Sequence, residues 1–153
     1  MSKLARIRKL SLCDAMVLTQ LAGCASGVAL ALKLVGWQRL SQSIIARSRG
    51  RRLRRLPLFH LRYTIEQLFG LVEMASSIFP RNRCLVRSML MLWLLRTRGE
   101  RAEVVLGVRK RAGAFEAHAW TRSEAGIVGE APDAIADFTV MTTSGSPPSS
   151  TPL

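Results

Sequence analysis

The chain has 153 residues, 48% of them hydrophobic, which is long and apolar enough for one globular domain with a buried core and excludes a wholly disordered chain. Its 23 Lys and Arg residues against 10 Asp and Glu residues give a formal net charge of +13, so attraction to an anionic partner is expected. Charge alone does not distinguish an acidic peptide from nucleic acid or an anionic membrane.

The cysteines predict a reducing environment. Cys13, Cys24 and Cys84 include no C-x-x-C pair. On one helix, Cys13 and Cys24 would lie roughly 16 Å apart along the axis, too far for a disulfide. We therefore expect free thiols and a cytoplasmic protein. With only His60 and His118 as histidines, a zinc site would need scattered, mixed ligands, so we expect no metal and no other cofactor.

Residues 3–40 are predicted to be helical, with a break near Gly36. Their start resembles an export signal, because a basic stretch precedes an apolar one and residues 21–24 resemble a lipobox. However, Asp14 interrupts the apolar stretch, and the uncharged run 15–32 contains polar residues and glycines, which makes it marginal as a membrane span. We expect this helix to be buried against the rest of the domain. Membrane association and export are the alternatives.

An arginine-rich segment follows, with six arginines in the nine residues 47–55. It is either a solvated connector between helices or a docking strip for an acidic partner or phosphates. It contains no aromatic residue, so binding of single-stranded nucleic acid is disfavoured and nucleic acid is not an expected partner. The docking interpretation assigns partner contacts to Arg51, Arg52, Arg54 and Arg55.

A second helix is predicted from about Thr64 to Ser77, because Thr64 and Gln67 can form a capping box and apolar residues follow on one face. The end of the chain is rich in Ser, Thr and Pro and has too little apolar surface to fold. We therefore expect three parts: a helical N-terminal region with the arginine-rich connector (1–78), a core (79–141) and a disordered tail (142–153).

The core is predicted to begin with a buried helix. Pro80 breaks the chain and Asn82 can cap a new helix. From Cys84 to Leu95, ten of twelve residues are apolar, the exceptions being Arg87 and Ser88. A helix that is apolar nearly all round belongs at the centre of a domain.

Three strands are predicted after this helix, at 104–108, 115–121 and 127–130, with a turn at 124–126. The order of these elements predicts an α+β fold, in which N-terminal helices precede a buried helix packed on an antiparallel β-meander.

Cys84 lies in the first turn of the predicted buried helix, where the helix dipole favours a thiolate. Arg81 and Arg83 add cationic neighbours. A lone cysteine in an apolar helix is more often an inert core residue, so its position alone does not make it a nucleophile.

His118 strengthens the catalytic interpretation, although a single histidine is more often structural. On its strand His118 shares a face with Glu116 and Trp120, while Ala117 and Ala119 occupy the other face and allow close packing. A strand histidine beside a helix-start cysteine provides the arrangement that nucleophilic catalysis needs. Trp120 is in addition a candidate contact for a substrate or partner.

The residues of the core resemble a known family. The segments RCLVRS at 83–88, LLRTRG at 94–99, LGV at 106–108 and AHAW at 117–120 resemble, in order and spacing, the transglutaminase-like leader peptidases of lasso peptide biosynthesis, the maturation protein B type. The resemblance covers about residues 79–137. It implies a transglutaminase/papain-like core and a Cys-His-acid triad that cuts the leader from a ribosomally made precursor, with Cys84 as nucleophile and His118 as base.

The third triad member is less clear, because the family usually has an Asp about a dozen residues after the histidine and this chain has Glu130 there. A three-residue turn at 124–126 would pair Glu130 with Trp120, on the face of His118. A two-residue turn would put Asp133 opposite His118 instead. We expect Glu130, with Asp133 as the alternative.

The resemblance also implies partners: the precursor peptide, a separate leader-recognition protein and an ATP-dependent macrolactam synthetase. Three other functions remain open. The same triad could catalyse amide transfer or deamidation. The chain could be a basic, non-catalytic scaffold or nucleic-acid-binding protein, with Cys84 in its core. It could also be a membrane-anchored protein.

Overall fold

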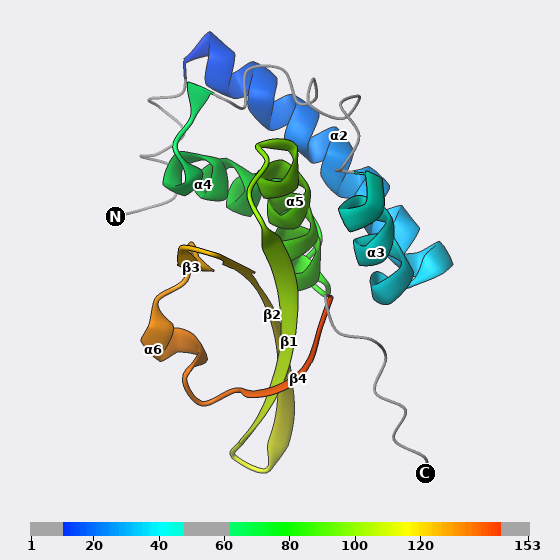
Figure 1. Cartoon of the computed structure of the whole chain (residues 1–153), viewed down its shortest axis with the longest axis vertical. Helices are drawn as coiled ribbons and strands as arrows, with labels where there is room; N and C mark the ends of the chain where they lie inside the picture. Colours follow the sequence, from blue (N-terminus) through cyan, green and yellow to red (C-terminus); the bar gives the residue numbers. More distant parts are fainter. Residues whose placement is uncertain (1–10, 48–61, 145–153) are drawn as a thin grey trace.

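The computed structural model describes residues 11–47 and 62–144 (Figure 1). Among these residues, four helices come first: α2 (Leu12–Val35), α3 (Trp37–Arg47), α4 (Ile65–Ser76) and α5 (Arg83–Thr97). The strands β1 (Ala102–Arg111), β2 (Ala114–Ser123), β3 (Gly126–Val128) and β4 (Thr139–Thr143) follow, with the short helix α6 (Pro132–Ile135) between β3 and β4. The predicted α+β fold is confirmed.

Helix α5 lies at the centre of the molecule, between the other long helices and the sheet (Figure 1). Nine of its residues are buried, which confirms the expectation from the apolar run. Helices α2 and α4 pack against α5, and one hydrophobic cluster joins the helices to β1 and β2. Helices α2, α3 and α4 therefore share a core with the described segment 79–141.

The predicted break near Gly36 is present, since Gly36 has a φ of 77° and separates α2 from α3. Beyond it the chain is helical to Arg47, further than the predicted end at residue 40. Residues 1–10, including the basic start of the predicted helix, lie outside the described ranges.

Asp14, which interrupts the apolar stretch in the sequence, caps α2. The Ser11 N–H donates to its Oδ2 at 2.9 Å, and the Tyr63 hydroxyl donates to its Oδ1 at 2.7 Å. The bond from Tyr63, followed by that from the Ser11 N–H, lowers the pKa of Asp14, and the same Tyr63 bond raises the pKa of Tyr63 to about 12. The charge thus ties the start of α2 to the segment that leads into α4.

Only one face of α2 is buried. Val17, Leu21 and Ala25 are inaccessible, whereas Leu30 and Leu34 are exposed. By length and composition α2 could also cross a membrane, with 22% of its most apolar window buried, but core helices of soluble proteins and signal sequences pass the same test. The expected burial against the domain therefore holds for one face.

Helix α4 begins with the predicted capping box. The Gln67 N–H donates to Thr64 Oγ1 at 3.2 Å, and the Thr64 N–H donates to Gln67 Oε1 at 2.9 Å. Two backbone donors at the helix start are thereby satisfied by neighbouring side chains, as the sequence predicted.

The strands form an antiparallel sheet in the order β3-β2-β1-β4. Strands β1 and β2 are longer than predicted and form a hairpin whose turn residues, Ala112 and Gly113, have φ values of 49° and 83°. Positive φ at both turn positions matches the right-handed twist of the strands. The three strands expected from the sequence are present, although β3 ends at Val128 rather than at Glu130.

Strand β4 was not predicted. It pairs with β1 at the sheet edge opposite β3, and it includes Thr142 and Thr143, which were expected in the tail. The Val104 N–H donates to Ser144 Oγ at 2.9 Å just after the strand. Pairing with β1 orders this polar segment, and the segment's own sequence carries no apolar alternation that would predict it.

Candidate active site

Cys84 is the second residue of α5 and is half-buried at the helix N-terminus. Asn82 occupies the N-cap position but makes no side-chain capping bond, contrary to the prediction. Its backbone, with φ −122° and ψ 21°, is not in the extended conformation that capping requires. The expected cationic neighbours are divided: Arg81 is exposed, whereas Arg83 forms an ion pair with Glu73.

His118 lies in β2 opposite Gly107 of β1. Its ring stacks on Trp120, with the centroids 6.2 Å apart, and lies 5.4 Å from the ring of Phe138. A Cβ at Gly107 would approach the Trp120 ring to 2.7 Å, so glycine at this position makes room for that ring. The rings of Trp120 and Phe138 thus pack against the imidazole.

Trp120 is only 5% exposed and therefore offers almost no surface to a partner. Val105, Ile135 and Phe138 pack with the indole in one hydrophobic cluster, and the candidate docking role of Trp120 stays a prediction. Its contact with His118 indicates support of the imidazole.

Glu130 reaches His118 from outside the sheet. Glu130 Oε2 lies 2.8 Å from His118 Nε2. Both predicted registers are wrong. Ser123 pairs with Gly126, so the turn consists of residues 124 and 125, and β3 ends at Val128, before Glu130 or Asp133 could pair with β2. Asp133, the alternative third member, is exposed in α6.

Gly129 redirects the chain between β3 and Glu130. Its φ is 73°, and a Cβ there would lie 2.2 Å from the Phe69 ring of α4. Both the backbone conformation and the space therefore require glycine. The position of Glu130 depends on this bend rather than on strand pairing.

Cys84 and His118 interact directly. Burial raises the pKa of the Cys84 thiol, but hydrogen bonds with His118 and the Ala119 N–H outweigh burial, so this pKa lies below the ordinary value. The pKa of His118 rises to about 9, first through its hydrogen bond with Cys84 and then through that with Glu130. Since Nε2 faces Glu130, Nδ1 is the nitrogen left for Cys84. Between these two pKa values the pair is a thiolate and an imidazolium.

Two residues near this pair were not identified from the sequence. Arg87 of α5 forms ion pairs with Glu130 and, at 2.8 Å, with Glu73 of α4. The sequence did contain a clue to Arg87, which is one of two polar residues in the run from Cys84 to Leu95. Glu73 had no comparable clue, because a glutamate on a partly exposed helix is ordinary.

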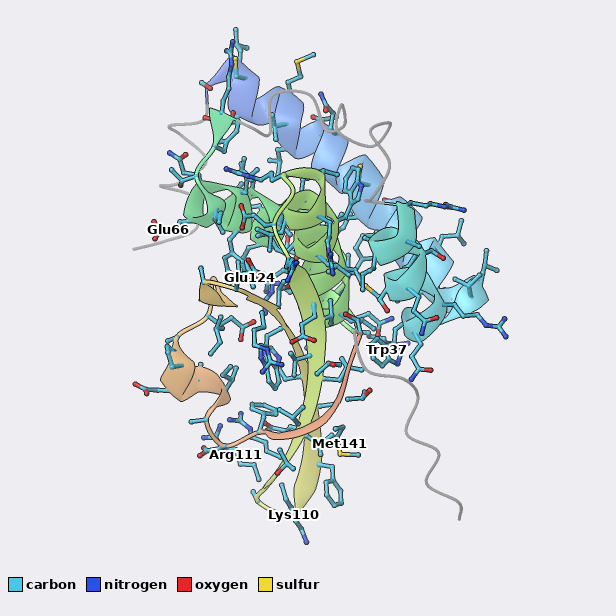
Figure 2. All side chains as sticks on the ribbon, in the orientation of Figure 1. Trp37, Glu66, Lys110, Arg111, Glu124 and Met141 are labelled. Carbon is cyan, nitrogen blue, oxygen red and sulfur yellow. The ribbon has the colours of Figure 1, made fainter. Side chains whose placement is uncertain are left out.

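Hollows flank His118 on both sides. A groove of about 360 Å³ contains Cys84 and His118, with Leu85, Leu106 and Met141 among its apolar lining residues. Met141 lies on the edge strand β4 (Figure 2). A second hollow, of about 340 Å³, is lined by His118, Glu130, Arg87 and Arg109 among others. The thiol therefore faces an open and largely apolar groove.

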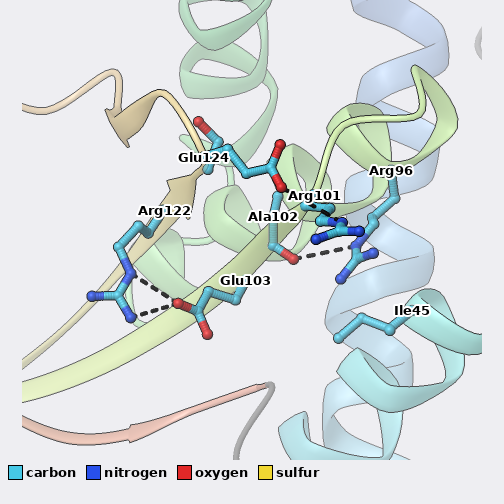
Figure 3. Close-up of a pocket in the computed structure, with 8 residues that line it drawn as sticks. Ile45, Arg96, Arg101, Ala102, Glu103, Arg122 and Glu124 are labelled. Atoms are coloured by element: carbon cyan, nitrogen blue, oxygen red, sulfur yellow. Dashed lines mark hydrogen bonds and ion pairs between the residues drawn. The ribbon is translucent and has the colours of Figure 1, made fainter.

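A third hollow, of about 280 Å³, lies away from these residues and is lined by charged side chains (Figure 3). Its ionic groups bind one another: Arg122 Nε donates to Glu103 at 2.8 Å, and Arg101 pairs with Glu124 at 3.5 Å. Because these charges are already paired, this hollow has no evident chemistry of its own.

Arg51, Arg52, Arg54 and Arg55, the predicted docking residues, lie outside the described residues. Within the ranges 11–47 and 62–144, no group of three or more His, Cys, Asp or Glu side chains is placed to hold a metal ion. Cys13, Cys24 and Cys84 are all free thiols.

Comparison with known families identifies the class of protein. Residues 24–143 match the model of the transglutaminase-like superfamily, which covers more than half of the chain. The chain therefore belongs to the transglutaminase-like superfamily. The match includes α3, α4 and the second half of α2, so the family region extends well beyond the resemblance at 79–137. No curated protein and no solved structure matches the chain.

Proposed function

We propose that this protein is a cysteine peptidase that removes the leader from a ribosomally made lasso peptide precursor, with Cys84, His118 and Glu130 as its triad. The observation that carries the proposal is the arrangement of three groups. The Cys84 thiol at the start of α5 is hydrogen-bonded to the His118 imidazole, and His118 Nε2 lies 2.8 Å from the Glu130 carboxylate. The superfamily match and the resemblance of residues 79–137 to the leader peptidases also support it.

In the proposed reaction, the Cys84 thiolate attacks the carbonyl carbon of the scissile bond. The carbonyl electrons move to oxygen, and the Cys84 backbone N–H is a candidate donor to that oxyanion. His118 then gives its proton to the leaving amine, the C–N bond breaks and a thioester remains on Cys84. His118 next takes a proton from water, which attacks the thioester and releases the acid and the thiolate. Glu130 holds the imidazole orientation throughout.

The proposed partners are the precursor peptide, a leader-recognition protein and an ATP-dependent macrolactam synthetase. The net charge of +13 supports docking of acidic segments, for which Arg51, Arg52, Arg54 and Arg55 are the proposed contacts. We propose a cytoplasmic location, with membrane association through α2 as the alternative.

The test is mass spectrometry of a candidate precursor incubated with the protein and its recognition partner. Wild type should release the leader, and Cys84→Ala and His118→Ala should not. Release by Cys84→Ala would refute the nucleophile assignment. A product mass lacking added water but containing an added amine would indicate amide transfer by the same residues instead. Tight nucleic-acid binding that collapses with salt, with no effect of Cys84→Ala on peptide maturation, would favour the basic scaffold.

A further inference from the structure

Arg87 links two carboxylates on different elements. It lies three residues after Cys84 on α5, so the two side chains leave adjacent turns of the same helix face. Its Nη1 donates to Glu73 Oε2 at 2.8 Å, and its Nη2 pairs with Glu130 Oε1. The side chains of Arg87 and Glu130 are only 12% and 11% exposed, so this pair is largely shielded from water.

The two oxygens of Glu130 have different partners. Oε1 binds Arg87 and Oε2 binds His118. Rotation of the carboxylate would break one of these contacts, so Arg87 determines the direction in which Oε2 points. Glu73 is shared in the same way, because its Oε1 binds Arg83 and its Oε2 binds Arg87.

Packing holds the guanidinium in this orientation. Its central carbon lies 5.1 Å from the centroid of the Phe69 ring of α4. The same ring fills the space beside Gly129, where the chain bends toward Glu130. Helix α4 therefore supplies both the ring that supports Arg87 and the second carboxylate that anchors it.

We propose that Arg87 is a positioning residue, whose paired contacts with Glu73 and Glu130 set the orientation of the Glu130 carboxylate and, through it, of the His118 imidazole. The inference rests on the proposed function but concerns a residue outside the triad. A guanidinium can address two carboxylates in fixed directions, whereas a lysine ammonium supplies the same charge as a single point. The substitution Arg87→Lys therefore separates position from charge.

Several charged groups lie around His118 and Glu130. They are Glu73 from α4, Cys84, Arg83 and Arg87 from α5, Arg109 from β1 and its partner Glu116 from β2. Arg87→Lys changes none of these charges. A change in the titration of Cys84 in this variant would therefore report geometry rather than net charge.

The experiment measures the rate at which iodoacetamide alkylates Cys84 as a function of pH. The background Cys13→Ser/Cys24→Ala leaves Cys84 as the sole thiol of the chain. In this background, thiolate reactivity should persist well below the ordinary thiol pKa and be lost in His118→Ala. In Arg87→Lys the labelling at about pH 6 should be about tenfold slower, because a higher Cys84 pKa leaves less thiolate at that pH.

Peptide cleavage provides a second readout. Arg87→Lys should lower kcat by up to about 10²-fold with KM little changed, because misplacement of about 1 Å in a site has effects of that size. Glu73→Gln should change both readouts in the same direction but less. Arg122→Lys is the matched control and should behave as wild type. Arg122 Nε donates to Glu103 at 2.8 Å, and this pair does not line the groove of Cys84 and His118.

Suppose that wild-type Cys84 is reactive and that a folded Arg87→Lys protein has the same labelling rate and the same kcat. This result would overturn the positioning role of Arg87 and leave the proposed triad intact. If circular dichroism shows that Arg87→Lys does not fold, the same two measurements are made on Glu73→Gln. A wild-type labelling rate and kcat in Glu73→Gln would then overturn the positioning role of Arg87. If wild-type Cys84 labels as an ordinary thiol regardless of His118, the proposed function itself fails, and this inference fails with it.

Discussion

The two sides of His118 differ in polarity and in burial. On one side, Glu130 and Arg87 are nearly buried and belong to a chain of ion pairs that reaches α4. On the other side, Cys84 faces a groove lined mainly by apolar residues such as Leu106. The difference indicates that the charged side orients the imidazole, whereas the apolar side is an open groove in which the proposed peptide substrate would lie.

The charged side also differs from ion pairs elsewhere on the molecule. Removing charges from water is costly, so buried pairs persist only when several contacts satisfy each group. Glu130 and Arg87 meet that condition, because each has two ionic partners. Arg101 and Glu124, at 82% and 70% exposure, form a solvent-screened pair expected to contribute little. Among the ion pairs of the described residues, the pair of Arg87 and Glu130 beside His118 is thus the most shielded between an arginine and a carboxylate.

The strongest way to break this comparison is Glu130→Gln, which removes the carboxylate but keeps its shape. We expect peptide cleavage to fall about 10²–10⁴-fold, because the imidazolium loses its orienting and stabilising partner. Asp133→Asn is the control and should retain activity, since Asp133 is exposed in α6. A full loss in Asp133→Asn, with activity kept in Glu130→Gln, would reverse the assignment of the acid.

The pH profile of the same variant sharpens the test. The pKa of His118 is about 9, so cleavage that needs the imidazolium should decline as the pH rises through about 9. In Glu130→Gln this decline should begin at lower pH. Because the folded pKa exceeds the ordinary 6.5, the stability contributed by His118 is complete below about 6.5 and is lost as the pH rises through about 9. Chemical denaturation across that range measures it.

Gly129→Ala tests whether backbone shape places the acid. A positive φ and contact with Phe69 should together destabilise the protein by about 2–4 kcal/mol and reduce cleavage. Gly126→Ala is the matched control, because Gly126 has a φ of 119° but no atom within 4 Å of the added Cβ. Equal effects of the two variants on activity would show that the Phe69 contact does not place Glu130.

Met141→Asp tests the apolar side of the comparison. Met141 lines the groove on β4 and is 63% exposed, so the fold should tolerate the change. We expect KM for a peptide to rise about tenfold or less with a smaller change in kcat, because the substitution removes apolar contact area from the groove. Val140→Asp, at a neighbouring position that is 50% exposed and does not line the groove, is the control. An unchanged KM in Met141→Asp would indicate that peptide does not occupy this part of the groove.

Tyr63→Phe should have the smallest effect. It removes the 2.7 Å hydrogen bond to Asp14, which ties α2 to the start of α4 far from His118. The expected cost is about 1–2 kcal/mol in thermal or chemical unfolding, with normal cleavage. A marked loss of cleavage would show that the helical region and the site are coupled through more than α4.

Local sequence patterns predicted much of the arrangement of the candidate site. The apolar run that starts at Cys84 predicted the central helix, and alternation around His118 predicted its strand and its shared face with Trp120. The capping pair Thr64 and Gln67 was also predicted. These features depend on residues at most a few positions apart, where helix and strand periodicity are informative.

The placement of Glu130 could not be derived in the same way. Strand register suggested a paired position for it, but β3 ends at Val128 and Glu130 lies beyond the bend at Gly129. That bend is fixed by Phe69, which is sixty residues earlier in the chain. The spacing in the resembling family favoured Glu130 as the third triad member. The strand pairing that was expected to bring Glu130 to the face of His118 is not present.

The sequence by itself thus determined the α+β class, the helix-start cysteine and the strand histidine, because each is encoded in short-range hydrophobic patterns. Only the tertiary structure decided that Glu130 contacts His118, and that Arg87 pairs with both Glu130 and Glu73. It also decided that Trp120 is buried with its ring stacked on that of His118. Contacts between distant segments follow from packing and pairing of whole elements, which no local pattern specifies.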